Sequence, residues 1–140
     1  MTETTIREDR DGYSVAVTVE RQGEHWAVTK VEMTQIPGGP SVTGEALRKL
    51  ALTPFIQAAA AHGGDEAEVA RETIADVTRD AERLRAAGPT NATLRWVGHV
   101  YGAANVLALP PVKTVQQAFG VSYRTATNWV AIAREGGLLL

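Results

Sequence analysis

The sequence predicts an α+β protein with an N-terminal β-hairpin and short helices, one long linking helix, and a C-terminal helix-turn-helix of three helices. Three observations support this prediction. Apolar residues alternate with polar ones over residues 13–19, as in a strand with one buried face. Apolar residues recur at helical spacing over residues 66–87. Two shorter helical patterns, residues 113–119 and 125–134, are joined by Gly-Val-Ser, which leaves room only for a tight turn.

These elements divide the 140 residues into three parts. Residues 1–62 hold the hairpin and short helices, residues 63–90 a long amphipathic helix, and residues 91–140 the helix-turn-helix domain. A chain of this length is sufficient for one ordinary domain, or for two small ones that share a core.

The hairpin begins with the alternating strand at Tyr13 and turns at residues 21–24, where Gly23 can adopt a positive φ. The return strand, residues 25–36, changes parity between Val28 and Val31, so we expect a bulge near Thr29 or Lys30. The polar flanks, residues 7–12 and 37–40, are predicted to be loops, and Trp26 is predicted to lie in the core. Because two strands alone are marginally stable, the hairpin has to pack on helices or pair with another copy.

Two short helices follow, over residues 44–52 and 54–62. Thr43 can cap the first, and Pro54 suits the first position of the second. His62 precedes two glycines and is expected to be a cation at a helix end, because no motif supplies a catalytic partner.

The long helix, residues 66–87, carries a narrow apolar seam. The seam has two interpretations that the sequence does not separate: packing on the body of its own subunit, or a two-fold dimer contact. The residues predicted for the dimer contact are Ile74, Val77, Ala81 and Leu84. Gly88-Pro89 ends this helix, and Thr90 or Asn91 can cap the next one, residues 92–109.

Within the helix-turn-helix, Gly120 can end one helix in the left-handed conformation, and Ser122 can cap the next. The spacing predicts a shared core of Val115, Phe119, Val121, Ala126, Trp129, Val130 and Ala133. The opposite face carries residue types that contact bases and phosphates. The predicted DNA-binding residues are Lys113, Thr114, Ser122, Tyr123, Arg124, Thr127, Asn128 and Arg134.

The segment GVSYRTATNWVAIAREGGLL resembles the helix-turn-helix of small actinobacterial and actinophage DNA-binding proteins, most of them uncharacterised. The matching positions are the Gly-Val-Ser turn, Thr125-Ala126, Trp129-Val130 and Arg134. Upstream, SVTGEALRKLALTPFI resembles the segment after a β-hairpin in several of these proteins. This chain departs from the pattern at Gln116, where alanine is usual. The resemblance implies a DNA-binding fold.

Composition excludes several kinds of chemistry. The chain has no cysteine, and its three histidines lack metal-ligand spacing, so neither disulfides nor a metal site is predicted. No glycine-rich phosphate loop, nucleophile elbow or zinc-protease motif occurs, so we expect no enzyme and no cofactor. No apolar run has membrane-spanning length and the N-terminus is polar, which predicts a cytoplasmic protein without a membrane partner.

Charge is polarised along the chain. Residues 91–140 carry four basic and one acidic residue, a net charge of +3, whereas the whole chain has −2. These observations predict sequence-specific binding of double-stranded DNA, in host or phage transcriptional control. Because one copy offers few cations, a homodimer is expected; no small-molecule effector is identified. The alternatives are a helix-turn-helix module that docks on and modulates another protein, and an accessory factor of DNA recombination or packaging.

Overall fold

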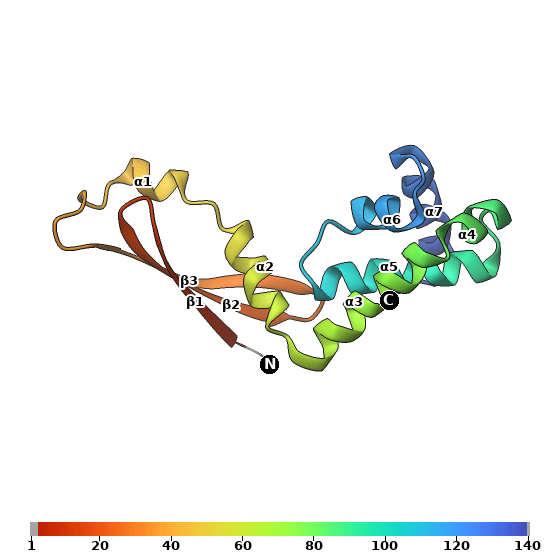
Figure 1. Cartoon of the computed structure of the whole chain (residues 1–140), viewed down its shortest axis with the longest axis horizontal. Helices are drawn as coiled ribbons and strands as arrows, with labels where there is room; N and C mark the ends of the chain where they lie inside the picture. Colours follow the sequence, from red (N-terminus) through yellow and green to blue (C-terminus); the bar gives the residue numbers. More distant parts are fainter. Residues whose placement is uncertain (1–2, 140) are drawn as a thin grey trace. The chain divides into compact units, whose positions relative to one another are not determined.

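A computed structural model describes residues 3–139 and confirms the α+β class. These residues form two compact units, divided between His62 and Gly63. The N-terminal unit contains three strands and two helices, and the C-terminal unit contains five helices (Figure 1).

The sheet of the N-terminal unit is antiparallel, in the order β1-β2-β3. Its strands are β1 (Glu3–Arg10), β2 (Tyr13–Gln22) and β3 (His25–Gln35). The loop predicted for residues 7–12 is therefore wrong for residues 7–10, which belong to β1, and is confirmed only for the turn at residues 11 and 12. Asp11 and Gly12 both have positive φ, 54° and 87°, and this two-residue turn joins β1 to β2. Asp-Gly is a favoured sequence for such hairpin turns.

The predicted bulge in the return strand is confirmed. Thr18 of β2 pairs with Lys30, whereas the next residue, Val19, pairs with Val28. Thr29 is therefore the extra residue. It restores a single apolar face, because Val28 and Val31 now lie opposite buried valines of β2. Trp26 is half-buried against the same core, as expected.

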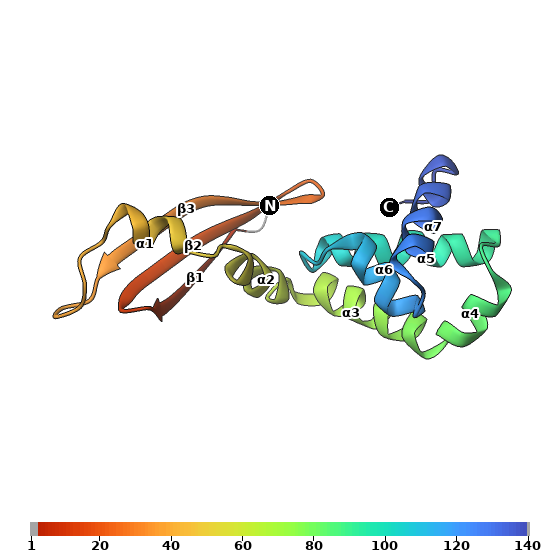
Figure 2. The same cartoon turned by 90° about the horizontal axis from the view of Figure 1, so that it is seen from above.

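Two helices, α1 (Gly44–Lys49) and α2 (Thr53–Ala61), cover one face of this sheet (Figure 2). We call this the inner face. The Thr43 side chain caps α1 by accepting a hydrogen bond of 3.0 Å from the amide of Ala46, as predicted. The buried centre of the unit is formed by α2 and the apolar residues of β2, namely Phe55 and Ala59 with Tyr13, Val15, Val17 and Val19.

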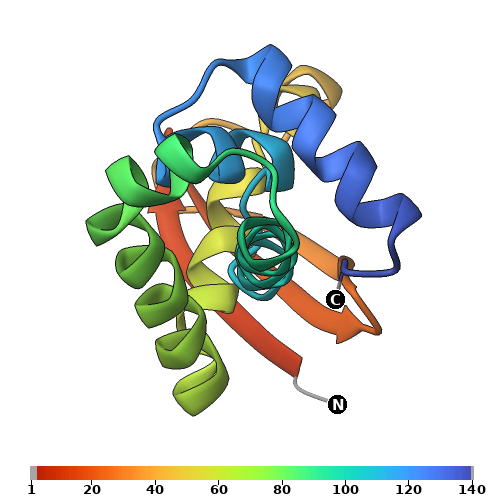
Figure 3. The ribbon, with the colours of Figure 1, turned by 90° about the vertical axis from the view of Figure 1, so that its right-hand side faces the viewer.

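The C-terminal unit is built around α5 (Asn91–Val106). Figure 3 looks along this helix, and α3, α6 and α7 surround it. The other helices are α3 (Gly64–Arg79), α4 (Ala81–Ala87), α6 (Pro111–Phe119) and α7 (Tyr123–Glu135). Thr90 caps α5 by accepting a hydrogen bond of 3.2 Å from the amide of Thr93. Among residues 3–139, none of the helices is both long and apolar enough to cross a membrane.

The single long helix predicted for residues 66–87 is in fact two helices, α3 and α4. The break falls at Asp80, whose φ and ψ of −96° and 9° are not helical. Asp80 ends α3 and begins α4, and its carboxylate contacts Arg83 at 3.2 Å. Aspartate is favoured at the start of a helix rather than inside one. The change of direction allows α4 to contact α6.

The apolar seam of α3 and α4 is buried inside the C-terminal unit. Val77, Ala81 and Leu84 are buried, and Ile74 packs half-buried against the same cluster, which includes residues of α5, α6 and α7. The expected dimer contact through Ile74, Val77, Ala81 and Leu84 is therefore wrong, because these side chains are already covered within one subunit. Residues 63–90 are likewise no separate linker.

Candidate nucleic-acid interface

The core between α6 and α7 contains the residues that the spacing predicted. Val115, Phe119, Ala126, Val130 and Ala133 are all buried. The rings of Phe119 and Trp129 meet edge to face, with centroids 5.7 Å apart. Ala126 is fully buried between the two helices. Because its side chain is small, the helices can lie close together there. This core fixes which face of α7 is turned outward.

The turn between α6 and α7 also forms as predicted. Gly120 has φ 65° and ψ 34°, the left-handed conformation that ends α6. The carbonyl of Gln116 accepts the amide of Val121 at 3.2 Å. The hydroxyl of Ser122 accepts the amide of Thr125 at 3.1 Å and caps α7. Gln116 itself is half-buried, and the turn is complete despite the departure from alanine at this position.

Arg85 of α4 supports this turn, a role that no sequence pattern indicates. Its Nη1 donates a hydrogen bond of 2.9 Å to the carbonyl of Phe119, the last residue of α6. A cation is favourable at this end of a helix. A Cβ at Gly120 would lie 2.6 Å from the same Nη1. Because 34 residues separate Arg85 from Phe119, only the fold brings them together.

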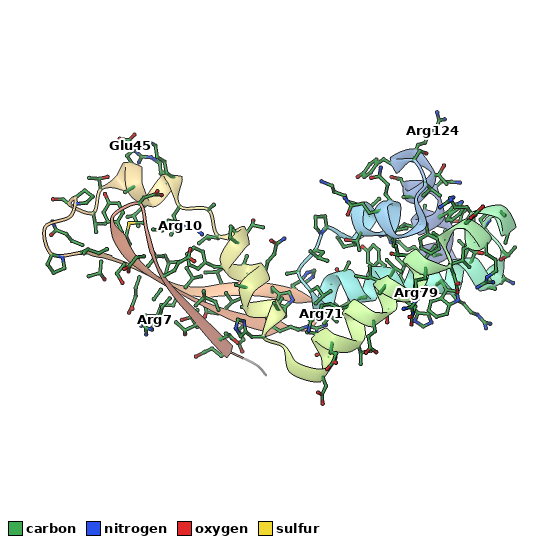
Figure 4. All side chains as sticks on the ribbon, viewed as in Figure 1. Arg7, Arg10, Glu45, Arg71, Arg79 and Arg124 are labelled. Atoms are coloured by element: carbon green, nitrogen blue, oxygen red, sulfur yellow. The ribbon has the colours of Figure 1, made fainter. Side chains whose placement is uncertain are left out.

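One surface of α7 is polar, exposed and shallowly hollowed. We call it the α7 groove, and it is lined by Arg124, Thr125, Thr127, Asn128 and Ala131. Figure 4 shows the side chain of Arg124 pointing away from the other helices of the C-terminal unit. Tyr123, at the beginning of α7, is 58% exposed. Four of the predicted residues, Tyr123, Arg124, Thr127 and Asn128, thus lie together at the N-terminal half of α7.

The groove combines the hydrogen-bonding groups that DNA recognition requires. Arg124 offers only donors, whereas the amide of Asn128 offers a donor and an acceptor. The hydroxyl of Thr127 donates to the carbonyl of Tyr123 at 2.9 Å, which leaves its oxygen to accept and its methyl group to make apolar contacts. Within residues 3–139, neither Arg124 nor Lys113 has an ion-pair partner.

The other predicted contact residues lie differently. Thr114 is only 7% exposed and its hydroxyl donates to the carbonyl of Pro110 at 2.7 Å, so its prediction as a DNA contact is wrong. Ser122 is exposed, but its hydroxyl caps α7. Lys113 is exposed in the first turn of α6. Arg134 is at the far end of α7, where its Nη2 lies 3.4 Å from the hydroxyl of Tyr101, and it does not line the α7 groove.

None of the residues that line the α7 groove is acidic, although α3 and α4 of the same unit carry several acidic residues. From Asn91 to the end of the chain the only one is Glu135, in the last turn of α7. The described residues contain no cluster of histidine, aspartate or glutamate that could hold a metal ion. Comparison of the chain with protein-family models, curated proteins and solved structures found no match. Function is therefore inferred from the geometry of the C-terminal unit.

Proposed function

We propose that the C-terminal unit binds double-stranded DNA by inserting α7 into the major groove, and that the protein is a sequence-specific transcriptional regulator. The observation that carries this proposal is the α7 groove itself. A capped helix projects arginine, threonine and asparagine from one exposed surface, and its opposite surface is held by a packed core. A helix of this kind is the reading element of helix-turn-helix proteins. The resemblance to actinobacterial and actinophage proteins supports the same proposal.

Three residues of the groove have distinct proposed roles, and two residues outside it contact the DNA backbone. Arg124, in the first turn of α7, donates two hydrogen bonds to the edge of a guanine. Asn128, one turn later, pairs with an adenine, and the methyl group of Thr127 contacts a thymine methyl. Lys113 and the hydroxyl of Tyr123 contact phosphates, which fix the position of the helix without selecting sequence.

Binding by one copy is expected to be weak at physiological salt. Affinity for DNA depends strongly on the number of phosphates neutralised, and residues 91–140 have only four basic residues. We therefore propose that two copies occupy two half-sites, with a contact other than the α3–α4 seam. Binding to chromosomal or phage DNA would also place the protein in the cytoplasm.

Selection from a random duplex pool, followed by mobility shift at two salt concentrations, tests the proposal. We expect a defined site to be enriched and its affinity to fall as salt rises. A pool that stays random, with no retained duplex at low salt, would exclude DNA binding.

A second candidate function is docking on another protein. The observation that favours it is the exposure of Tyr123, because aromatic side chains are common anchors of protein interfaces. The two functions respond differently to substitution. Tyr123→Ala would abolish protein docking, whereas it would weaken DNA binding only by the loss of one phosphate contact.

A further inference from the structure

The N-terminal unit contains a cavity between α1 and the inner face of the sheet. Its volume is about 490 Å³, within the range of small-molecule sites. α1 spans the cavity without burying any of its own residues. The lining residues that the proposal uses are Arg10, Tyr13, Val15, Met33, Ala46 and Leu50.

The cavity lining combines polar and apolar residues, and the apolar ones deepest on the sheet side are already covered. Val15 and Tyr13 of β2 are buried, and Met33 of β3 lies opposite Val15 in the sheet. Ala46 and Leu50, in and just after α1, are half-buried above them. Protein interiors are normally packed to crystal-like density. A ligand with an apolar body would therefore cover side chains that α1 leaves only partly covered.

One charge is positioned to face such a ligand. Arg10 lies opposite Tyr13 at the end of β1, on the inner face of the sheet. Its guanidinium lies over the ring of Phe55, 5.0 Å from the centroid, and pairs with the carboxylate of Glu8. These two contacts fix its position and leave further N–H donors, because a guanidinium has five.

The other charged lining residues are more exposed. Lys49 and Glu45 of α1 neutralise each other at 2.8 Å, with side chains 74% and 69% exposed. Asp11 is exposed in the β1–β2 turn. Among the described residues that line the cavity, Arg10 is thus the only charged one that is half-buried. Its partner Glu8 does not line the cavity, so the N–H donors of Arg10 that Glu8 leaves free are available to an acceptor group of a ligand.

We propose that this cavity binds a small amphipathic acid, with its apolar body on Met33, Ala46 and Leu50 and its carboxylate on the guanidinium of Arg10. The site is independent of the proposed function, because it involves only residues of the N-terminal unit.

Titration of the full-length chain with decanoate, followed by amide chemical shifts, tests the proposal. We expect saturable shifts at Tyr13, Val15 and Ala46, with residues 123–135 unchanged. Two matched probes carry the same chain: decanol lacks the charge, and decyltrimethylammonium reverses it. Both are expected to bind at least about ten-fold more weakly, because a hydrogen bond to a charged group is lost. Equal binding of all three would overturn the assignment to Arg10, and shifts spread over the whole chain would overturn the site.

Two variants and one control separate binding from folding. Arg10→Gln should weaken decanoate binding about ten-fold or more. The control is Arg48→Gln, which also removes one positive charge. Arg48 is in α1 but does not line the cavity, so this variant should bind decanoate as the parent does. Ala46→Phe should block binding by filling the cavity, with the sheet's amide spectrum preserved. If Ala46→Phe folds and still binds decanoate with the affinity of the parent, the cavity is not the site.

Discussion

Replacing Gly120 by alanine separates two energetic contributions at the turn before α7. The first is backbone strain, because φ of 65° lies in the left-handed region; this costs about 1 kcal/mol for alanine. The second is the contact with Arg85, since the new Cβ would lie 2.6 Å from its Nη1. The arginine side chain is flexible, so it moves away and loses its hydrogen bond to the carbonyl of Phe119. That loss costs about another 1 kcal/mol.

Gly137 provides the matched control. It has φ of 69° and follows the end of α7 in the same unit, and a Cβ added there would meet no atom within 4 Å. Gly137→Ala should therefore cost only the backbone strain, about 1 kcal/mol. Gly120→Ala should cost about 2 kcal/mol, Arg85→Gln about 1, and the double variant about 2 rather than 3, because both changes remove the same hydrogen bond.

Urea unfolding measures these differences. The chain has three tryptophans, and a Trp26→Phe background leaves Trp96 and Trp129 to report on the C-terminal unit. An equal loss of stability in Gly120→Ala and Gly137→Ala would show that Arg85 does not constrain the turn. Fully additive losses in the double variant would contradict the shared hydrogen bond.

Three further outcomes follow from the structure. Val77 is 2% exposed, so Val77→Asp buries a charge and should lower the free energy of unfolding by about 3 kcal/mol or more. Sedimentation should show the same oligomeric state as the parent. A shift to smaller species would instead show that Val77 lies in a dimer contact. Thr114→Val should leave the affinity for DNA unchanged in a mobility-shift assay. A clear loss of affinity would show that Thr114 contacts DNA. The hydrogen bond and the charge of Lys30 lower the pKa of Glu32. The Lys30–Glu32 ion pair therefore contributes stability that is lost as pH falls through the lowered pKa of Glu32. In Lys30→Met, a carboxyl titration by NMR should give a higher pKa for Glu32, and an unchanged value would exclude the pair.

Features set by neighbouring residues could be predicted from the sequence. The end of α6 at Gly120 and the cap of α7 at Ser122 depend on a few adjacent residues, and both form as expected. The bulge at Thr29 could be located because one extra residue brings Val28 and Val31 to the same face. β1 is harder to predict because its residues are mostly charged, although the Asp11-Gly12 turn is a usable signal.

Features set by contacts between distant segments could not be predicted. An apolar seam looks the same whether α5 or a second subunit covers it, so Val77 gives no indication of its partner. Thr114 and Thr127 are the same residue type in adjacent helices, yet one is buried and the other lines the α7 groove. Arg85 reaches the carbonyl of Phe119 only because α4 turns at Asp80.

The most direct test of DNA recognition by α7 is fluorescence anisotropy with the selected duplex, comparing the parent with Arg124→Ala and Arg48→Ala. Both variants lose one positive charge, but only Arg124 lines the α7 groove. We expect Arg124→Ala to weaken binding by about 1 to 3 kcal/mol and to relax selectivity at one base pair, with Arg48→Ala close to the parent. Equal affinities for the parent and Arg124→Ala, with both proteins folded, would contradict the proposal that α7 recognises DNA.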